Sequence, residues 1–221
     1  EDTGMVTDSW NGFNVLHTAA SRVAGLDIGF VPGKGGKDVA AMLKAAAKGE
    51  MKLVWLLGAD ELDMSALSDS FVIYQGHHGD AGAAAADVIL PGAAYTEKDG
   101  LYVNFEGRVQ MARRATFPPG EAKEDWAIIR ALSEWLNKTL PFDNVGAVRE
   151  ALMAAAPSFQ TLDEIVPAKW AKFGRAGKLS EEKVSAGLSQ FHMTCAVSRS
   201  SETMAGCHQA VQAGDTSLAA E

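Results

Sequence analysis

Apolar residues in the first part of the chain alternate between helical spacing and short continuous runs. Spacing at i, i+3, i+4 and i+7 predicts an amphipathic helix that ends at Gly49, with its buried face formed by Val39, Met42, Leu43 and Ala46. An earlier helix is expected over about residues 10–23. The glycine-rich interval 29–36 between the two is expected to be a loop.

Three short apolar runs follow, and a glycine closes each of them within two residues. They are Leu53–Leu57, Phe71–Tyr74 and Val88–Leu90. Runs without alternation are typical of strands that are buried on both faces of a parallel sheet. The order of helical and strand signals therefore predicts a doubly wound α/β layer.

The pattern changes after this layer. Turn signals at Asp99-Gly100 and Glu106-Gly107 flank strand-forming residues, which predicts a small β excursion. Helices are expected over about 123–137 and 145–156. From about residue 158 the apolar periodicity weakens, so we expect an α/β domain over 1–157. Residues 158–221 are expected to form a C-terminal extension and docking tail, extended at first and then helical over about 201–212.

Composition and charge narrow the class of protein. Hydrophobic residues make up 47% of the 221 positions, and the formal net charge is −8. An acidic chain without a Lys/Arg block is a poor match for nucleic acid, so no nucleic-acid partner is expected. No apolar run reaches the ~18 residues that a transmembrane helix needs. The first residue is Glu1, and we therefore expect a processed chain or a fragment of a longer one.

The cysteines exclude two kinds of site within this chain alone. Cys195 and Cys207 are the two cysteines present, and they form no C-x-x-C pair. An iron–sulfur cluster usually takes four thiolates, and a structural zinc site takes four Cys/His ligands. Both cysteines are expected to be reduced. His192 lies close to Cys195 in sequence, but this is weak evidence for a nucleophile.

The glycine loop Gly33–Asp38 invites comparison with phosphate-binding loops. A P-loop has the pattern G-x-x-x-x-G-K-[ST], whereas here Val31 stands at the first glycine and Asp38 at the Ser/Thr position. The dinucleotide fingerprint must follow a strand, and this loop does not. A flexible loop before a helix is the favoured interpretation.

Two further groups of polar residues could carry chemistry. His77 and His78, with Asp80, follow a predicted strand, where open α/β sheets bind ligands. Adjacent histidines usually project in different directions, so a polar loop is favoured over a metal site. The carboxylates in the β excursion could act in acid–base catalysis, but solvation or pairing with Arg108 is favoured for Glu97, Asp99 and Glu106. No catalytic, cofactor-binding or metal residue is assigned.

One long ordered block resembles the signature of the molybdopterin oxidoreductase superfamily. Its pattern is A-D-V-x-L-P, then E-x-x-G, then N-x-E-G-R-x-Q. The matching positions run from Ala86-Asp87-Val88 to Leu90-Pro91, through Glu97 and Gly100, to Asn104, Glu106-Gly107-Arg108 and Gln110.

Four further segments resemble one branch of that superfamily, the large iron–sulfur subunits of NADH-quinone oxidoreductase, or respiratory complex I. They are Trp10–Val23, Gly25–Gly33, Gly76–Asp80 and Phe117–Trp126. The ending from Met193 to Cys207 is similar to the C-terminal ending of that family, although Cys195 stands where a polar residue is expected.

The resemblance implies a fold and a role. The fold is a Rossmann-like doubly wound sheet of the formate dehydrogenase-like type. In that family, iron–sulfur clusters (2Fe-2S and 4Fe-4S) lie in an N-terminal part and pass electrons from NADH towards quinone. This chain matches the C-terminal part, which is taken to lack molybdopterin. Consistent with this, Gly76–Gly82 replaces the Thr-Glu-Thr-Ala type segment that touches the pterin in active relatives.

From the resemblance we expect a non-catalytic scaffold portion with no cofactor of its own. Its expected partners are other peripheral-arm subunits, with membrane contact only through the complex. That places it on the cytoplasmic face of a bacterial inner membrane or the matrix side of the mitochondrial one. Turns, caps and an internal ion pair are the roles expected for Asp87, Glu97, Asn104, Glu106 and Arg108. The alternatives are part of an active molybdopterin enzyme, such as a formate dehydrogenase, and a nucleotide-binding module.

Overall fold

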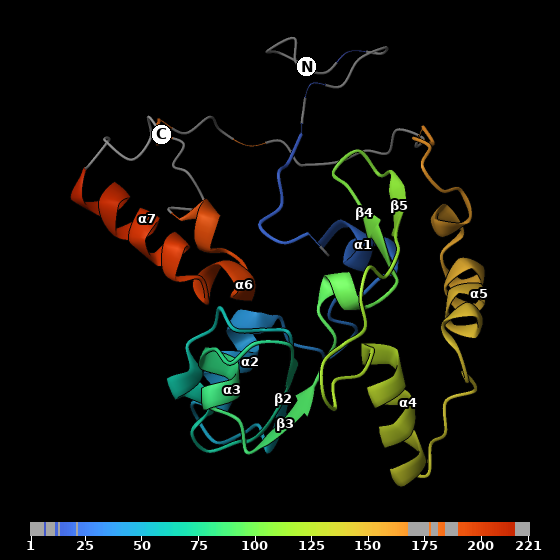
Figure 1. The fold of residues 1–221 in the computed structure, drawn as a ribbon, viewed down its shortest axis with the longest axis horizontal. Helices are drawn as coiled ribbons and strands as arrows, with labels where there is room; N and C mark the ends of the chain where they lie inside the picture. Colours follow the sequence, from blue (N-terminus) through green and yellow to red (C-terminus); the bar gives the residue numbers. More distant parts are fainter. Residues whose placement is uncertain are drawn as a thin grey trace.

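The computed structural model describes residues 7, 12, 14–20, 22–167, 177, 181–183 and 190–214, and the fold is given for these (Figure 1). A parallel sheet has the order β1-β2-β3, formed by β1 (Leu53–Leu57), β2 (Phe71–Gly76) and β3 (Val88–Pro91). Trp55 pairs with Ile73, and Ile73 pairs with Val88. All three strands expected from the apolar runs are confirmed.

One face of this sheet carries the larger core. Leu56, Val72 and Tyr74 are buried there against Ala46 and Leu67. Ala46 belongs to α2 (Val39–Ala46), which confirms the predicted amphipathic helix, and Leu67 belongs to η1 (Met64–Leu67). The short helix α3 (Ala81–Ala84) follows β2 and packs against it.

The opposite face is covered at one end. The helix α4 (Asp125–Trp135) begins at the carboxyl ends of the strands, where Gln75 Nε2 donates to Asp125 Oδ1 at 2.9 Å. At the other end of this face Leu53, Phe71 and Val88 are 52%, 47% and 39% exposed. The prediction of strands buried on both faces is therefore wrong at these positions. Leu57, on the same face at the carboxyl end of β1, is also 52% exposed, so this face is open along β1 as well.

A second core lies under an antiparallel hairpin of β4 (Gly100–Val103) and β5 (Val109–Ala112), which confirms the predicted β excursion. Gly107 adopts a φ of 84° in the connecting turn, a conformation that favours glycine. Val103 and Val109 are buried there against Ala156 and Phe159. The surrounding elements are α1 (Arg22–Asp27), η2 (Tyr95–Glu97), α5 (Val145–Ala155) and η3 (Pro157–Gln160).

The two long helices expected after the hairpin are confirmed as α4 and α5, but the helix expected over 10–23 is wrong. Residues 14–20 are not helical, and α1 begins only at Arg22. Val15 and Leu16 are exposed, so this segment has no buried face to stabilise a helix. Residues 8–11, 13 and 21 lie outside the described part.

The C-terminal elements are η4 (Phe191–Met193), α6 (Ala196–Arg199) and α7 (Glu202–Ala213). Ser201 caps the start of α7 and Gly214 ends it with a φ of 72°, which confirms the helix expected over 201–212. Most of the predicted extended arm, at 168–176, 178–180 and 184–189, lies outside the described residues. Across the described ranges, no helix has the length and apolar character needed to cross a membrane.

Tyr74 occupies a tight space in the larger core. Its hydroxyl lies 3.2 Å from both Asp60 Oδ2 and the carbonyl oxygen of His78, either of which can accept its proton. Gly82 closes over the ring. A Cβ at Gly82 would lie 2.8 Å from Asp60 Oδ1 and 2.8 Å from two ring carbons of Tyr74.

Replacing Gly82 by alanine should therefore destabilise the fold. We expect Gly82→Ala to lower the free energy of unfolding by about 1–3 kcal/mol, because the added methyl group overpacks a filled core. Urea denaturation measures the change. Gly79→Ala is the matched control, since a Cβ there meets no atom within 4 Å. Equal stability of the two variants would contradict this packing.

Candidate functional site

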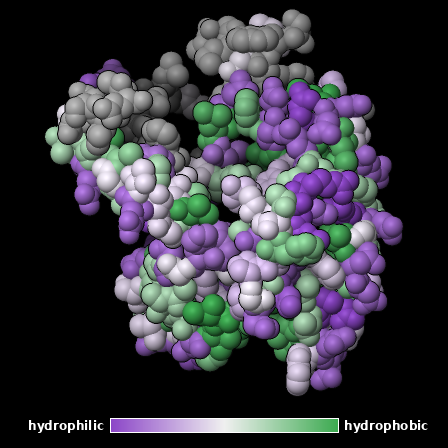
Figure 2. All heavy atoms as spheres, viewed as in Figure 1, coloured by the Kyte–Doolittle hydropathy of each residue, from purple (hydrophilic) through white to green (hydrophobic). Residues whose placement is uncertain are grey.

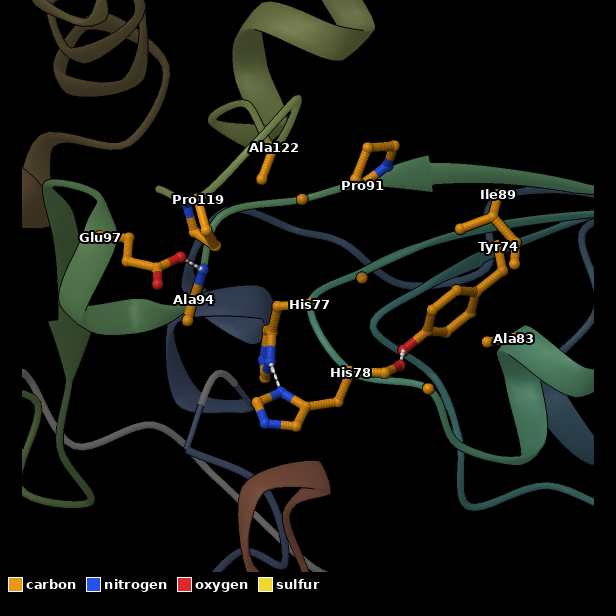
Figure 3. A pocket seen from close by; sticks show the side chains of 13 residues that line it. Tyr74, His77, His78, Ala83, Ile89, Pro91, Ala94, Glu97, Pro119 and Ala122 are labelled. Atoms are coloured by element: carbon orange, nitrogen blue, oxygen red, sulfur yellow. Dashed lines mark hydrogen bonds between the residues drawn. The ribbon is translucent and has the colours of Figure 1, made fainter. Parts of the chain in front are cut away.

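A cavity of about 580 Å³ opens beside the carboxyl ends of β2 and β3 (Figure 3). Open α/β sheets bind ligands at this edge, because the loops that leave neighbouring strands diverge there. Loops after β2 and β3 supply most of the wall, and the segment before α4 closes it. The lining residues are Tyr74, Gly76, His77, His78, Gly79, Ala83, Ile89, Pro91, Gly92, Ala94, Glu97, Pro119 and Ala122.

His77 and His78 converge in this cavity. Their Nδ1 atoms lie 2.6 Å apart and their rings meet edge to face at 87° (Figure 3). The expectation that the two side chains project in different directions is wrong, because the backbone bends at both residues instead of continuing the strand. One ring must donate a hydrogen bond and the other accept it. Burial, together with the neighbouring His78 and Lys98, lowers the pKa of His77, which favours the neutral form of this imidazole.

The histidine pair does not extend to a metal centre. Asp80 is engaged elsewhere, with Arg199 and with the backbone N–H of Ala81. Within the described part of the chain, no three His, Cys, Asp or Glu side chains gather as a metal site would require. The two imidazoles hydrogen-bond to each other.

Three of the residues expected to form turns and caps hold backbone N–H groups: Glu97 caps η2, Asn104 shapes the hairpin turn, and Asp87 instead holds the neighbouring strand β2. Asp87 Oδ2 accepts from the N–H of Val72 at 2.7 Å, and Glu97 Oε2 accepts from the N–H of Ala94 at 2.9 Å. Asn104 Oδ1 accepts from the N–H groups of Glu106 and Arg108, which shapes the hairpin turn.

In place of the predicted ion pair, Arg108 makes a hydrogen bond to a backbone oxygen. Its guanidinium donates to the carbonyl oxygen of Asp163 at 2.6 Å. Asp99 instead accepts from the N–H of Arg114, and this hydrogen bond lowers the pKa of Asp99. The side chains of Asp87, Glu97, Asp99, Asn104 and Arg108 thus all hydrogen-bond to backbone atoms. Of this set, and among the described residues, only Glu97 lines the cavity.

The glycine loop and the cysteines lie away from the cavity. Gly36 N–H donates to the carbonyl of Gly33, and Asp38 caps α2 through the N–H of Ala41. Cys195 caps α6, where hydrogen bonds from Ser198 lower the pKa of its exposed thiol. His192 contacts His208.

Sequence reasoning missed the ion cluster that joins the C-terminal elements to the sheet. Arg199 of α6 donates from Nε to Asp80 Oδ2 at 2.6 Å and from Nη1 to Glu61 Oε1 at 2.8 Å. Its Nη2 lies 3.9 Å from the buried Asp60 Oδ2. The hydrogen bond from Arg199 lowers the pKa of Asp80. Asp60 and Glu61 follow β1 and Asp80 follows β2, so α6 is held at the carboxyl edge of the sheet.

Removing this arginine should release the C-terminal elements. We expect Arg199→Gln to leave Asp60 and Asp80 without a cation and to raise hydrogen exchange in α6 and α7. Hydrogen-exchange mass spectrometry compares this variant with Arg22→Gln, which changes an exposed arginine of α1. Unchanged protection of α6 in Arg199→Gln would show that the cluster does not hold it.

The hydroxyl of Tyr74 should lose its proton at a higher pH than an ordinary tyrosine, which an alkaline titration can detect. Burial, followed by the charge of Asp60, raises the pKa of Tyr74 to about 12. Because the folded-state pKa exceeds the ordinary value of about 10, stability should be retained below pH 10 and lost as the pH rises towards 12. The ultraviolet tyrosinate spectrum should lose its latest-titrating component in Tyr74→Phe. An identical titration curve for the two proteins would refute the assignment.

Comparisons with known proteins match these elements in two blocks. The model of the molybdopterin oxidoreductase family matches residues 1–135, and the model of the C-terminal region of the NADH-ubiquinone oxidoreductase G subunit matches residues 164–207. The solved structure of acetylene hydratase from Pelobacter acetylenicus aligns with a TM-score of 0.43 and 19% identity, covering 56% of this chain and 19% of that one.

The residues along the cavity do not fit the cofactor for which the first family is named. Molybdopterin carries an anionic phosphate and a polar pterin edge, which need cationic, amide or hydroxyl partners. Among the described lining residues none is Lys, Arg, Ser, Thr, Asn or Gln. The lining instead offers apolar groups, one carboxylate and two imidazoles that hydrogen-bond to each other. The Tyr74 hydroxyl also lies there, but it is already within hydrogen-bonding distance of Asp60 and of the His78 carbonyl.

The similar proteins share most of this chain's length but are much longer. The mitochondrial 78 kDa subunit of NADH-ubiquinone oxidoreductase from Neurospora crassa is 43% identical over 96% of this chain and 29% of its own length. The corresponding Candida albicans subunit is 48% identical over 90% of this chain and 28% of its own length. The G subunit of NADH-quinone oxidoreductase from Rickettsia conorii is 44% identical over 97% of this chain and 30% of its own length. This chain thus spans under a third of these relatives. It belongs to the molybdopterin oxidoreductase family, and it corresponds to the C-terminal molybdopterin-like region of the complex I G subunit.

Proposed function

We propose that this chain is a non-catalytic scaffold region of an NADH-quinone oxidoreductase subunit. The observation that carries the proposal is the cavity at the carboxyl edge of the sheet, whose described lining lacks the side chains that would bind a pterin phosphate. The fold of a cofactor-binding enzyme is therefore retained without the polar groups for the cofactor. What remains is a shaped support for neighbouring parts of the complex.

The ion cluster around Arg199 supports the same proposal. In an open α/β enzyme the loops after β1 and β2 would face a ligand. Here three of their carboxylates face Arg199 of the same chain. A permanent side-chain contact occupies this part of the edge, which suits a structural role.

Electron transfer is proposed for the longer subunit and not for this region. The relatives are named as NADH-quinone or NADH-ubiquinone oxidoreductase subunits, and more than two thirds of their length lies outside the similarity. We propose that 2Fe-2S and 4Fe-4S clusters lie in that remainder. Other peripheral-arm subunits are the proposed partners, on the cytoplasmic face of a bacterial membrane or the matrix side of the mitochondrial inner membrane.

We further propose that the chain divides into an α/β domain over 1–157 and an extension over 158–221. The two family models, which match 1–135 and 164–207, support a boundary between them. The contacts of Arg199 indicate that part of the extension docks on the domain of its own chain.

Elemental analysis of the native assembly tests the proposed function. We expect iron in stoichiometric amounts, and molybdenum and tungsten at background, when the full-length protein is purified with its partners. Cofactor released by denaturation should show no pterin fluorescence. Stoichiometric molybdenum or tungsten would mean an occupied site and would make the alternative, an active molybdopterin oxidoreductase, correct.

A further inference from the structure

Three arginines gather around one carboxylate between the hairpin and α5. Arg113 and Arg114 directly follow β5, and Arg149 reaches the same place from α5. Arg113 Nη1 lies 4.0 Å and Arg149 Nη2 lies 3.8 Å from Asp99 Oδ2. With Phe117, these three arginines form what we call the arginine surface.

The carboxylates nearby neutralise these guanidinium groups incompletely. The distances to Asp99 exceed hydrogen-bonding range, and Arg114 Nη1 lies 4.0 Å from Glu124 Oε1. Glu124 also accepts a hydrogen bond from Trp126 Nε1 at 2.6 Å. Nη2 of Arg149 is buried without a hydrogen-bond partner. Three cations share two loosely placed anions, which leaves a local positive charge on a chain of net charge −8.

An exposed aromatic ring lies within the same surface. The guanidinium carbon of Arg114 lies 4.3 Å from the centre of the Phe117 ring, and Phe117 is 76% exposed. Arginine and aromatic side chains are enriched in the centres of protein–protein interfaces, where they contribute much of the affinity. A bare phosphate ligand would gain little from the phenyl ring.

The backbone that presents these side chains is fixed in place. The N–H groups of Ala115 and Thr116 both donate to the carbonyl of Thr96, at 2.8 and 3.2 Å. The N–H of Arg114 donates to Asp99 Oδ1 at 2.7 Å. Little backbone freedom would be lost on binding, which favours association. Figure 2 shows hydrophilic side chains gathered on the side of the molecule where the hairpin and α5 lie.

We propose that the arginine surface binds a carboxylate-rich segment of a neighbouring protein chain. Carboxylates of the partner would pair with the exposed guanidinium groups of Arg113 and Arg114, and its apolar groups would cover Phe117. A phosphate polyanion is disfavoured, because it has no apolar group to cover the exposed Phe117 ring. The inference rests on the proposed function and names a docking surface for it.

Zero-length cross-linking in the assembled complex tests the contact. Arg113→Lys, in the full-length protein, keeps the charge and introduces a primary amine at a side chain that is 72% exposed. A water-soluble carbodiimide joins that amine to a carboxylate in direct contact, forming an amide, and mass spectrometry identifies the pair. We expect linkage to Asp or Glu of another protein chain, with less at the exposed Lys34, which serves as an internal control. Linkage only to carboxylates of the same chain, or none, would overturn the proposal.

A charge reversal supplies the quantitative test. Arg113→Glu should weaken the affinity of the subunit for the rest of the complex by about tenfold and lower the salt concentration that releases it. Lys34→Glu makes the same change in net charge and should leave both unchanged. If Arg113→Glu instead weakened only the binding to anionic lipid vesicles, a membrane contact would replace this inference. Failure of the subunit to co-purify with any respiratory subunit would count against the proposed function itself, whereas normal assembly of both variants would count against this inference alone.

Discussion

A buried carboxylate, Asp60, is the point on which the carboxyl edge of the sheet depends. Its Oδ1 accepts from the N–H of Gly82, and its Oδ2 lies within reach of the Tyr74 hydroxyl and faces Arg199. A carboxylate removed from water is costly unless several donors compensate it. These donors come from β2, α3 and α6, so satisfying one side chain fixes three elements together.

The same arrangement engages polar groups at this edge in contacts within the chain. The polar groups that leave the ends of β1 and β2 are already paired within the chain, and the remaining cavity presents mainly imidazole and apolar atoms. Around the hairpin, positive charge is in excess, since three guanidinium groups lie near only two carboxylates, Asp99 and Glu124.

Local patterns in the sequence predicted the elements that are stabilised by neighbouring residues or that consist of a strongly apolar run. The runs at Leu53–Leu57 and Phe71–Tyr74 became strands, and α2 and α7 followed apolar periodicity or capping signals. Features set by tertiary contact were missed. The convergence of His77 and His78 depends on a backbone bend, and the pairing of Arg199 with Asp80 spans 119 positions. The helix expected over 10–23 was wrong because start and stop signals in the sequence do not report whether a surface exists for the helix to pack against.

The open end of the sheet has a consequence for how this region is produced and handled. Leu53, Phe71 and Val88 form an exposed apolar face. Two separate copies meet at such a face at a rate that rises with the square of their concentration. Dilution should therefore slow self-association of this region when it is produced by itself.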